Sequence, residues 1–234
     1  MKHIYCIAFA AAVMCVLAVF PANAQQEATY EVEYEEPQSY KDFRLAVGGG
    51  YAFRLGKVEK TGDSRLDDLN RQLRHGLTVD ADAQYFFKET WGLGVNINYC
   101  SSSTSGDNVD IPNFGSVNRY TESQNVLFVG PSFASRIESS KFMFISSFAV
   151  GPLFYIDRMN IDGGTLNATQ TTFGFNAGIG GEYKLSARTG AGLKLSYTLG
   201  TVNSVEVNGQ NLKYDQPISV SNLMISAFLS FRSW

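Results

Sequence analysis

The sequence predicts an all-β fold, an eight-stranded antiparallel transmembrane β-barrel with a short helix in the first outer loop. Eight segments between residues 43 and 232 alternate large apolar residues with small or polar ones, as strands facing two environments do. Tight turns at one end and longer loops at the other are typical of bacterial outer-membrane barrels. The gaps between the segments alternate in this way: the long ones are 56–75, 104–121, 157–170 and 202–216, and the short ones are 88–90, 137–141 and 186–188.

The first 24 residues have the layout of a cleaved signal peptide, so the chain is expected to be exported. Lys2 and His3 precede an apolar run over 4–20, and the small residues 22–24 supply a cleavage site. An uncleaved anchor helix is disfavoured because such a span needs about 20 apolar residues. Two of the three cysteines lie in this segment, which leaves Cys100 without an internal disulfide partner.

Residues 25–41 form an acidic segment before the first strand. Five glutamates alternate with tyrosines there, a composition that predicts a mostly disordered segment, and strand parity places it in the periplasm. The mature chain would carry 18 basic and 22 acidic residues, a formal charge of −4. No basic excess remains, so nucleic acid is not an expected partner. The barrel domain is assigned to 42–234.

The strands follow in order along the chain. In the first, 43–55, every second residue is large and apolar, while alternate positions hold Gly, Ala, Arg44 and Arg54. The second and third, 77–87 and 91–100, repeat the pattern, and the sixth and seventh, 173–185 and 190–200, are the most regular. The fourth, fifth and eighth, about 122–136, 142–156 and 217–232, are less regular.

Alternation alone also fits a soluble lipocalin-like barrel with the apolar face inside. Here the other face is dominated by glycine, which weakens exposed strands but suits the narrow bore of an eight-stranded barrel. The centre of the apolar face carries no Asp, Glu, Lys or Arg. A Lys or Arg there would destabilise a barrel in lipid by about 2–4 kcal/mol. Aromatic residues cluster at both strand ends, as two interfacial girdles would. The apolar face is therefore predicted to contact lipid.

Two prolines interrupt strands that should be fully hydrogen-bonded. Pro131 and Pro152 occur in the repeated triplets 129–131 and 150–152, at similar distances from the turn at 137–141. Because a closed barrel has no edge strand, paired β-bulges are expected at that height.

Charged residues on the inner face predict a network in the lumen. Asp80 and Asp82 are expected to face Lys194 or Arg54, and Glu182 to pair with Lys184, Arg136 or Arg44. Salt bridges that plug the bore are favoured over a gated ion path because the bore is narrow. The predicted network consists of Arg44, Arg54, Asp80, Asp82, Arg136, Glu182, Lys184 and Lys194.

The first outer loop contains a predicted amphipathic helix over 65–74. Ser64 and Asp67 have capping-box spacing, and Gly76 follows as a stop signal. His75 would then lie at the helix's carboxyl end, where a partly cationic side chain is favourable. The helical leucines either cap the barrel mouth or contact a partner, with capping favoured. The outer-loop contact candidates are Leu66, Leu69, Leu73, Phe114 and Tyr120.

Catalytic chemistry has little support in the sequence. His75 is the only histidine of the mature chain, so neither a two-histidine metal site nor the usual histidine-based hydrolase constellations can be assembled. We expect no enzymatic activity, no cofactor and no metal site.

Two stretches carry a family resemblance: residues 66–77, Leu-Asp-Asp-Leu-Asn-Arg-Gln-Leu-Arg-His-Gly-Leu, and residues 80–87 followed by Trp91-Gly-Leu-Gly-Val. With the signal peptide and eight strands, the chain resembles the small outer-membrane β-barrel proteins of Bacteroidetes-type bacteria, similar in architecture to the OmpA, OmpX and OmpW group. The resemblance covers about 42–234 and implies architecture more than function. One departure is Trp234, which is out of phase with the apolar residues Leu229 and Phe231 of the last strand.

The resulting hypothesis is a non-enzymatic barrel of the cell outer membrane with periplasmic termini, acting as an envelope structural element or a surface interaction and adhesion platform. The alternative is a narrow channel for small solutes or ions through the lumen, and a lipid-modifying enzyme ranks third. Expected partners are outer-membrane lipids and lipopolysaccharide, the barrel-assembly machinery and periplasmic chaperones during biogenesis, and an unknown surface or periplasmic partner.

Overall fold

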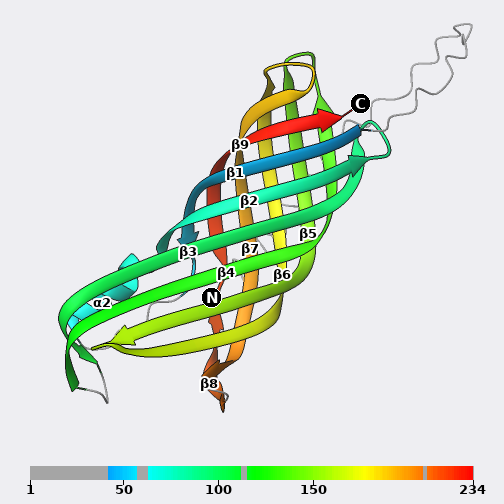
Figure 1. Ribbon diagram of the computed structural model, residues 1–234. Helices are drawn as coiled ribbons and strands as arrows, with labels where there is room; N and C mark the ends of the chain where they lie inside the picture. Colours follow the sequence, from blue (N-terminus) through cyan, green and yellow to red (C-terminus); the bar gives the residue numbers. More distant parts are fainter. Residues whose placement is uncertain (1–41, 57–62, 112–114, 208–209, 234) are drawn as a thin grey trace, which may run out of the picture. The chain divides into compact units, whose positions relative to one another are not determined.

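The computed structural model describes residues 42–56, 63–111, 115–207 and 210–233 (Figure 1). The predicted signal peptide, the acidic segment 25–41, Phe114 and Trp234 lie outside these residues. No helix in the described part is long and apolar enough to cross a membrane.

The described residues form a closed antiparallel barrel. β1 to β7 each pair with the next strand along the chain, and β9 closes the ring by pairing with both β7 and β1. β8 continues the same wall: it pairs with the distal part of β7 and is separated from β9 only by Val220 and Ser221. Eight strands thus complete the ring, as predicted. The elements are β1 (Asp42–Arg54), α2 (Ser64–Gln72), β2 (His75–Phe86), β3 (Trp91–Ile111), β4 (Gly115–Glu138), β5 (Phe142–Ile161), β6 (Gly164–Lys184), β7 (Thr189–Val207), β8 (Gln210–Ser219) and β9 (Asn222–Ser233).

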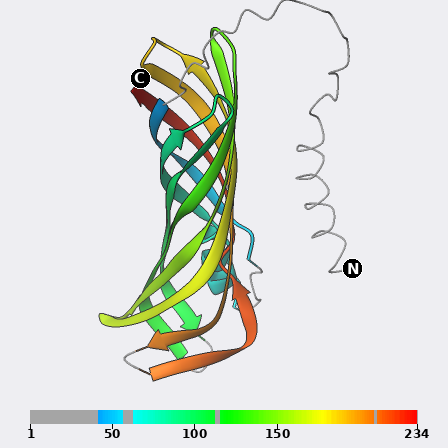
Figure 2. The ribbon, with the colours of Figure 1, turned by 90° about the vertical axis from the view of Figure 1, so that its right-hand side faces the viewer.

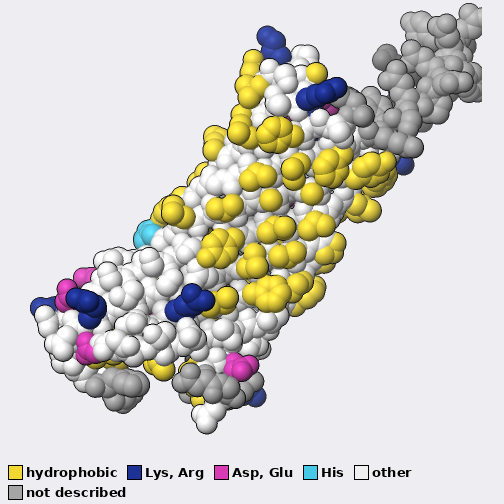
Figure 3. Space-filling model, in the orientation of Figure 1, with side chains coloured by type: hydrophobic (Ala, Val, Ile, Leu, Met, Phe, Trp, Pro, Cys, Tyr) yellow, Lys and Arg dark blue, Asp and Glu magenta, His cyan; other side chains and the backbone are white. Residues whose placement is uncertain are grey.

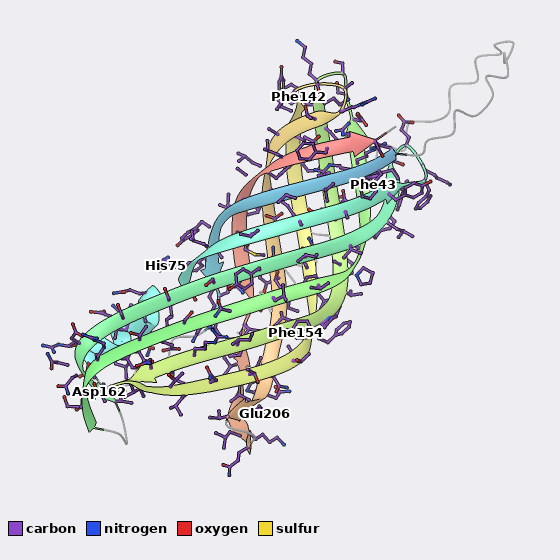
Figure 4. The ribbon with its side chains drawn as sticks, in the orientation of Figure 1. Phe43, His75, Phe142, Phe154, Asp162 and Glu206 are labelled. Carbon is purple, nitrogen blue, oxygen red and sulfur yellow. The ribbon has the colours of Figure 1, made fainter. Side chains whose placement is uncertain are left out.

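The barrel has two unlike ends. We call the end with the short turns 87–90, 139–141 and 185–188 the turn end; β1 begins and β9 finishes there. The other, the hairpin end, carries the β3–β4, β5–β6 and β7–β8 hairpins (Figures 1 and 2). Figure 4 shows Phe43 and Phe142 toward the turn end, and Asp162 and Glu206 at the hairpin tips.

The predicted long loops 104–121, 157–170 and 202–216 are mostly strand, which corrects the sequence assignment. β3 and β4 stay paired to Ile111 and Gly115, and β5 and β6 turn tightly at Asp162 and Gly163, both at positive φ. The Ser- and Asn-rich composition concealed this because the inward apolar residues there, Val109 and Val117, are few. These inward positions can be recognised as buried strand positions only when α2 is seen to pack against them.

The apolar face points outward and forms a continuous band between the two ends (Figure 3). Exposed aromatic residues border this band, with Phe43, Tyr85 and Trp91 at the turn end and Tyr51 and Tyr99 toward the hairpin end. Phe154 lies near the same hairpin-side border (Figure 4). Such a belt fits a transmembrane barrel, and we take the segments between the two aromatic borders as the membrane-spanning part.

The expected bulges at Pro131 and Pro152 are absent, so that prediction was wrong. Ladder pairing between β4 and β5 stops after Phe128–Leu153 and resumes at Ser132–Ala149, with three residues left out on each strand and no register shift. A Cβ added to Gly151 would lie 2.2 Å from the Val129 carbonyl oxygen and 2.8 Å from Gly130 Cα. Each strand has a proline here, which has no backbone N–H to donate. The two facing glycines allow the strands to stay close despite the missing hydrogen bonds.

Candidate functional site

Lys194 occupies the middle of the lumen and pairs with two carboxylates of β2. Its Nζ lies 3.1 Å from Asp80 Oδ1 and 2.5 Å from Asp82 Oδ2, and all three side chains are almost fully buried. Asn96 Nδ2 donates to the other oxygen of Asp82 at 2.8 Å. This is the pairing that the sequence predicts, because the inward positions of β2 and β7 face each other across the bore.

A second cluster near the turn end centres on Glu182. Arg44 donates to Glu182 Oε2 through Nη2 at 2.8 Å, and Arg232 contacts Oε1 at 2.7 Å. Glu138 then joins Arg232 at 2.8 Å and Lys184 at 2.5 Å. Lys184 therefore pairs with Glu138 and not with Glu182, which was one of its predicted partners. The reason is that Lys184 is the last residue of β6 and lies beside the 139–141 turn, where β4 ends at Glu138.

Arg136 has yet another partner. It forms a buried ion pair with Asp42, and its guanidinium lies 4.0 Å from the centre of the Phe86 ring. Sequence reasoning missed Asp42, Glu138 and Arg232 as members of the network. The parity of the apolar residues in the last strand could have placed Arg232 inward, since it alternates with Leu229 and Phe231.

Arg54 lies apart from this network. Its guanidinium lies 5.4 Å from the centre of the Tyr155 ring, toward the hairpin end, and the carboxylates Asp80 and Asp82 pair with Lys194 instead. Of the two alternatives predicted for Asp80 and Asp82, Lys194 or Arg54, the structure has Lys194. Cys100 is buried, as its parity predicts, with its Sγ 3.2 Å from Met224 Sδ.

The bore is filled by side chains. Phe86, Phe128 and Leu153 are fully buried inside it, and Phe228 lies beneath the Arg44 guanidinium at 5.3 Å. A cavity lined by Arg44, Asp82, Lys194 and neighbouring residues measures about 10 Å³, space for about one water molecule. Several buried polar atoms of the lumen also have no protein partner: Asp42 Oδ1, Asp80 Oδ2, Asn96 Oδ1, Asn98 Nδ2, Ser132 Oγ, Ser196 Oγ and Ser226 Oγ.

A third polar cluster, which we call the vestibule cluster, comprises Tyr120, Glu122, Gln124, Tyr155 and Asp157 on the inner faces of β4 and β5. Gln124 Nε2 donates to Glu122 Oε1 at 2.6 Å and contacts Asp157 Oδ2 at 3.4 Å. The Tyr120 hydroxyl donates to Glu122, and the Tyr155 hydroxyl donates to Asp157 Oδ2 at 3.0 Å. The cluster lies beyond the Phe154 border, outside the membrane-spanning part.

The vestibule cluster holds two carboxyl groups, Glu122 and Asp157, in a buried site where two negative charges repel each other. Burial and the neighbouring Glu122 carboxylate raise the pKa of Asp157 to about 7. Among the described residues, no Lys or Arg lies within salt-bridge distance of either carboxylate. Sequence analysis missed both acids because it placed Asp157 in a loop, which has no inward face, and Glu122 at the very start of an irregular strand.

Helix α2 covers the inner side of the β3–β4 extension. Asp63 caps it by accepting the N–H groups of Arg65 and Leu66, so the cap precedes the predicted Ser64. Three outer-loop contact candidates, Leu66, Leu69 and Tyr120, are buried together with Val109 and Val117. Leu73 is also buried, and the burial of all three leucines fits the capping role that the sequence favours.

His75 begins β2 instead of ending the helix. Its Nδ1 hydrogen-bonds to the Tyr51 hydroxyl, and its ring makes an edge contact with Phe53 at 5.4 Å. It lies at the hairpin-side border of the apolar band, where Figure 3 shows the histidine in cyan. Its neighbours on this face are aromatic, and among the described residues no three His, Cys, Asp or Glu side chains gather as a metal site would require.

Leu69→Ala tests the packing of α2. We expect local destabilisation of about 2–4 kcal/mol, because a buried leucine is removed from a small cluster. Hydrogen exchange should speed up in α2 and at the tips of β3 and β4, while strands within the apolar band keep their protection. Exposed Arg71→Ala on the same helix is the control; equal protection in both variants would contradict this packing.

Comparisons with known proteins agree with the barrel. The family model described as "Outer membrane protein beta-barrel domain" matches residues 12–221. Among solved structures, a major outer membrane protein from Thermus thermophilus is 10% identical with a TM-score of 0.53, covering 83% of this chain and 100% of that chain. Neisserial surface protein A is 12% identical with a TM-score of 0.46, covering 81% and 96%. The outer membrane protein OprG from Pseudomonas aeruginosa is 8% identical with a TM-score of 0.48, covering 83% and 97%.

The comparison with curated proteins finds no match. Identities this low bear on the fold alone, and a role cannot be transferred from them. The family match is different, since it spans most of the chain and coincides with a closed eight-stranded ring bearing an outward apolar band. This chain therefore belongs to the outer membrane protein beta-barrel domain family, which places it in the outer membrane.

Proposed function

We propose that this barrel is a non-enzymatic surface interaction platform whose hairpin end faces the medium. The orientation follows from the turns, because outer-membrane barrels keep short turns in the periplasm and longer connections outside. Both ends of the barrel domain, β1 and β9, would then be periplasmic, along with the acidic segment 25–41, and export would depend on the 1–24 signal peptide.

The observation that carries the proposal is that β3 to β6 continue as an ordered sheet beyond the apolar band. An inner apolar cluster under α2 supports this extension, so its outer face is held rigidly. A rigid surface loses little conformational entropy on binding. The outer face is exposed and rich in hydroxyl and amide groups, including Ser103, Ser105, Ser116, Asn118, Thr165, Asn167 and Thr169.

The platform is tested by Ser103→Lys, Ser105→Lys and Asn118→Lys combined, which changes only exposed positions. The barrel in lipid nanodiscs is assayed against an array of surface polysaccharides and proteins. We expect saturable binding by the wild type and loss of at least about tenfold in affinity for the triple variant, since these exposed positions form the proposed contact face.

Both proteins must show the heat-dependent gel shift of a folded barrel. Thr201→Lys, Asn203→Lys and Gln210→Lys combined, at exposed positions of β7 and β8, add the same three charges and are the matched control. Undiminished binding by the triple variant would show that the β3–β4 face is not the contact surface.

A second candidate function, a narrow path for water or small ions, draws on the unpartnered polar atoms of the lumen. Such atoms are usually satisfied by ordered water. The filled bore and buried ion pairs favour the closed state. Planar-bilayer recordings separate the two ideas: we expect a silent wild-type barrel, whereas discrete conductance that changes in an Asp82→Asn variant would support the channel.

A further inference from the structure

The vestibule cluster contains two buried carboxylates that share one amide. Glu122 and Asp157 are 6% and 8% exposed, and Gln124 Nε2 bridges them. The Arg54 guanidinium stacks over Tyr155 and makes no salt bridge to either acid among the described residues. Arg54 attracts Asp157 without forming a salt bridge to it, so the two buried acids face one cation at a distance, and a proton or a further cation would complete the charge balance.

Two buried oxygen atoms in the same cluster point to a missing ligand. Asp157 Oδ1 belongs to a side chain more than nine-tenths buried and has no hydrogen-bond partner, and Gln124 Oε1 is likewise buried and unpartnered. Both atoms are acceptors, so the group that would satisfy them must be a donor or a positive ion. The unpartnered Asp157 Oδ1 points to a ligand in either orientation of the Gln124 amide; with the amide turned over, Oε1 takes the place of Nε2 between the two carboxylates and can join them in holding a cation.

The donor set identifies the class of ion. Carboxylate and amide oxygens are hard ligands that suit Ca²⁺, which accepts flexible coordination completed by water, whereas transition metals favour nitrogen and sulfur. We propose that Glu122, Gln124 and Asp157 hold a Ca²⁺-class divalent cation in the vestibule beneath α2. Its affinity would lie in the range of extracellular modules, Kd on the order of 10⁻⁴–10⁻³ M, because only three side chains contribute.

The charge balance supports this assignment. Asp157 is buried and linked to the Glu122 carboxylate through Gln124, so a bound cation would offset both the burial of its charge and its repulsion from Glu122. The ion would also join β4 to β5 next to the α2 cluster, since Gln124 and Asp157 are paired across these strands. The site is independent of the surface proposed to bind a partner, which lies on the outward face of the same strands.

Terbium luminescence tests the proposal directly, because Tb³⁺ occupies Ca²⁺ sites and is sensitised by nearby tyrosine. The full chain is refolded in a non-ionic detergent free of lipopolysaccharide, which itself binds divalent cations, and titrated with Tb³⁺. Tyr120 and Tyr155 lie within the cluster. We expect saturable emission under tyrosine excitation that added CaCl₂ displaces.

Glu122→Gln and Asp157→Asn, singly and together, are expected to weaken Tb³⁺ binding by more than about tenfold. Exposed Glu206→Gln on the β7–β8 hairpin makes the same chemical change outside the cluster and should bind as the wild type does (Figure 4). Tyr155→Phe should lower the sensitised emission while calorimetry with CaCl₂ still detects binding. Each variant is first shown to be folded by its heat-dependent gel shift.

Two outcomes would overturn the site. The first is a folded wild type without saturable, Ca²⁺-displaceable emission, which would leave a proton or water as the ligand of Asp157. The second is equal loss of emission in the Glu206→Gln control, which would mean that Tb³⁺ binds the exposed acids in general.

Discussion

Lys194→Met is expected to destabilise the barrel by about 3–5 kcal/mol, because it leaves two buried carboxylates without their cation. Methionine keeps most of the side-chain volume, so the loss comes from charge and hydrogen bonding more than from a cavity. Urea unfolding in lipid vesicles, followed by the heat-dependent gel shift, measures the change in the free energy of unfolding.

A compensating variant separates charge from packing. Lys194→Met combined with Asp80→Asn and Asp82→Asn removes the uncompensated charges, so it should recover most of the lost stability. A single variant as stable as the wild type would show that water reaches these carboxylates and that the bore is more hydrated than its packing implies.

Gly192→Val is expected to prevent folding or to cost more than about 3 kcal/mol. A Cβ at this position would lie 2.1 Å from the Gly181 carbonyl oxygen and 2.6 Å from Phe228 Cζ, so both the backbone and a buried ring would have to move. The yield of heat-modifiable barrel after refolding, and its urea midpoint when it folds, measure the effect.

Gly181→Val supplies the matched control. It lies on the neighbouring strand one residue from the partner of Gly192, yet a Cβ there meets nothing within 4 Å. Because this face contacts lipid, valine should be neutral or slightly favourable there. Equal loss of folding in both variants would contradict the assignment of the two strand faces.

Much of the lumen could be predicted because strand parity fixes which side chains face inward. The pairing of Lys194 with Asp80 and Asp82 follows from inward positions at similar heights. The choice among partners for Glu182 did not follow, since Arg44, Arg136 and Lys184 were all inward candidates. Register decided it: β1 lies beside β9, so Arg44 and Arg232 are cross-strand neighbours and both reach Glu182.

The vestibule cluster and the β3–β6 extension were beyond reach of the sequence alone. Residues 104–121 read as loop because polar outward residues outnumber the apolar ones that face inward. Their strand conformation depends on a surface for Val109, Val117 and Tyr120 to pack against, and α2 supplies that surface from a segment far earlier in the chain. Likewise, the interrupted ladder at Pro131 needs no bulge because Gly130 and Gly151 meet across the strands.

By itself the sequence determined the barrel, its eight strands, the lipid-facing side of each and the helix in the first long connection, because these depend on local periodicity and spacing. Only the tertiary structure decided how far the hairpins extend, which ions pair in the bore and that Glu122 and Asp157 lie together. Those features arise from contacts between residues distant in sequence, where strand register and packing, not composition, set the distances.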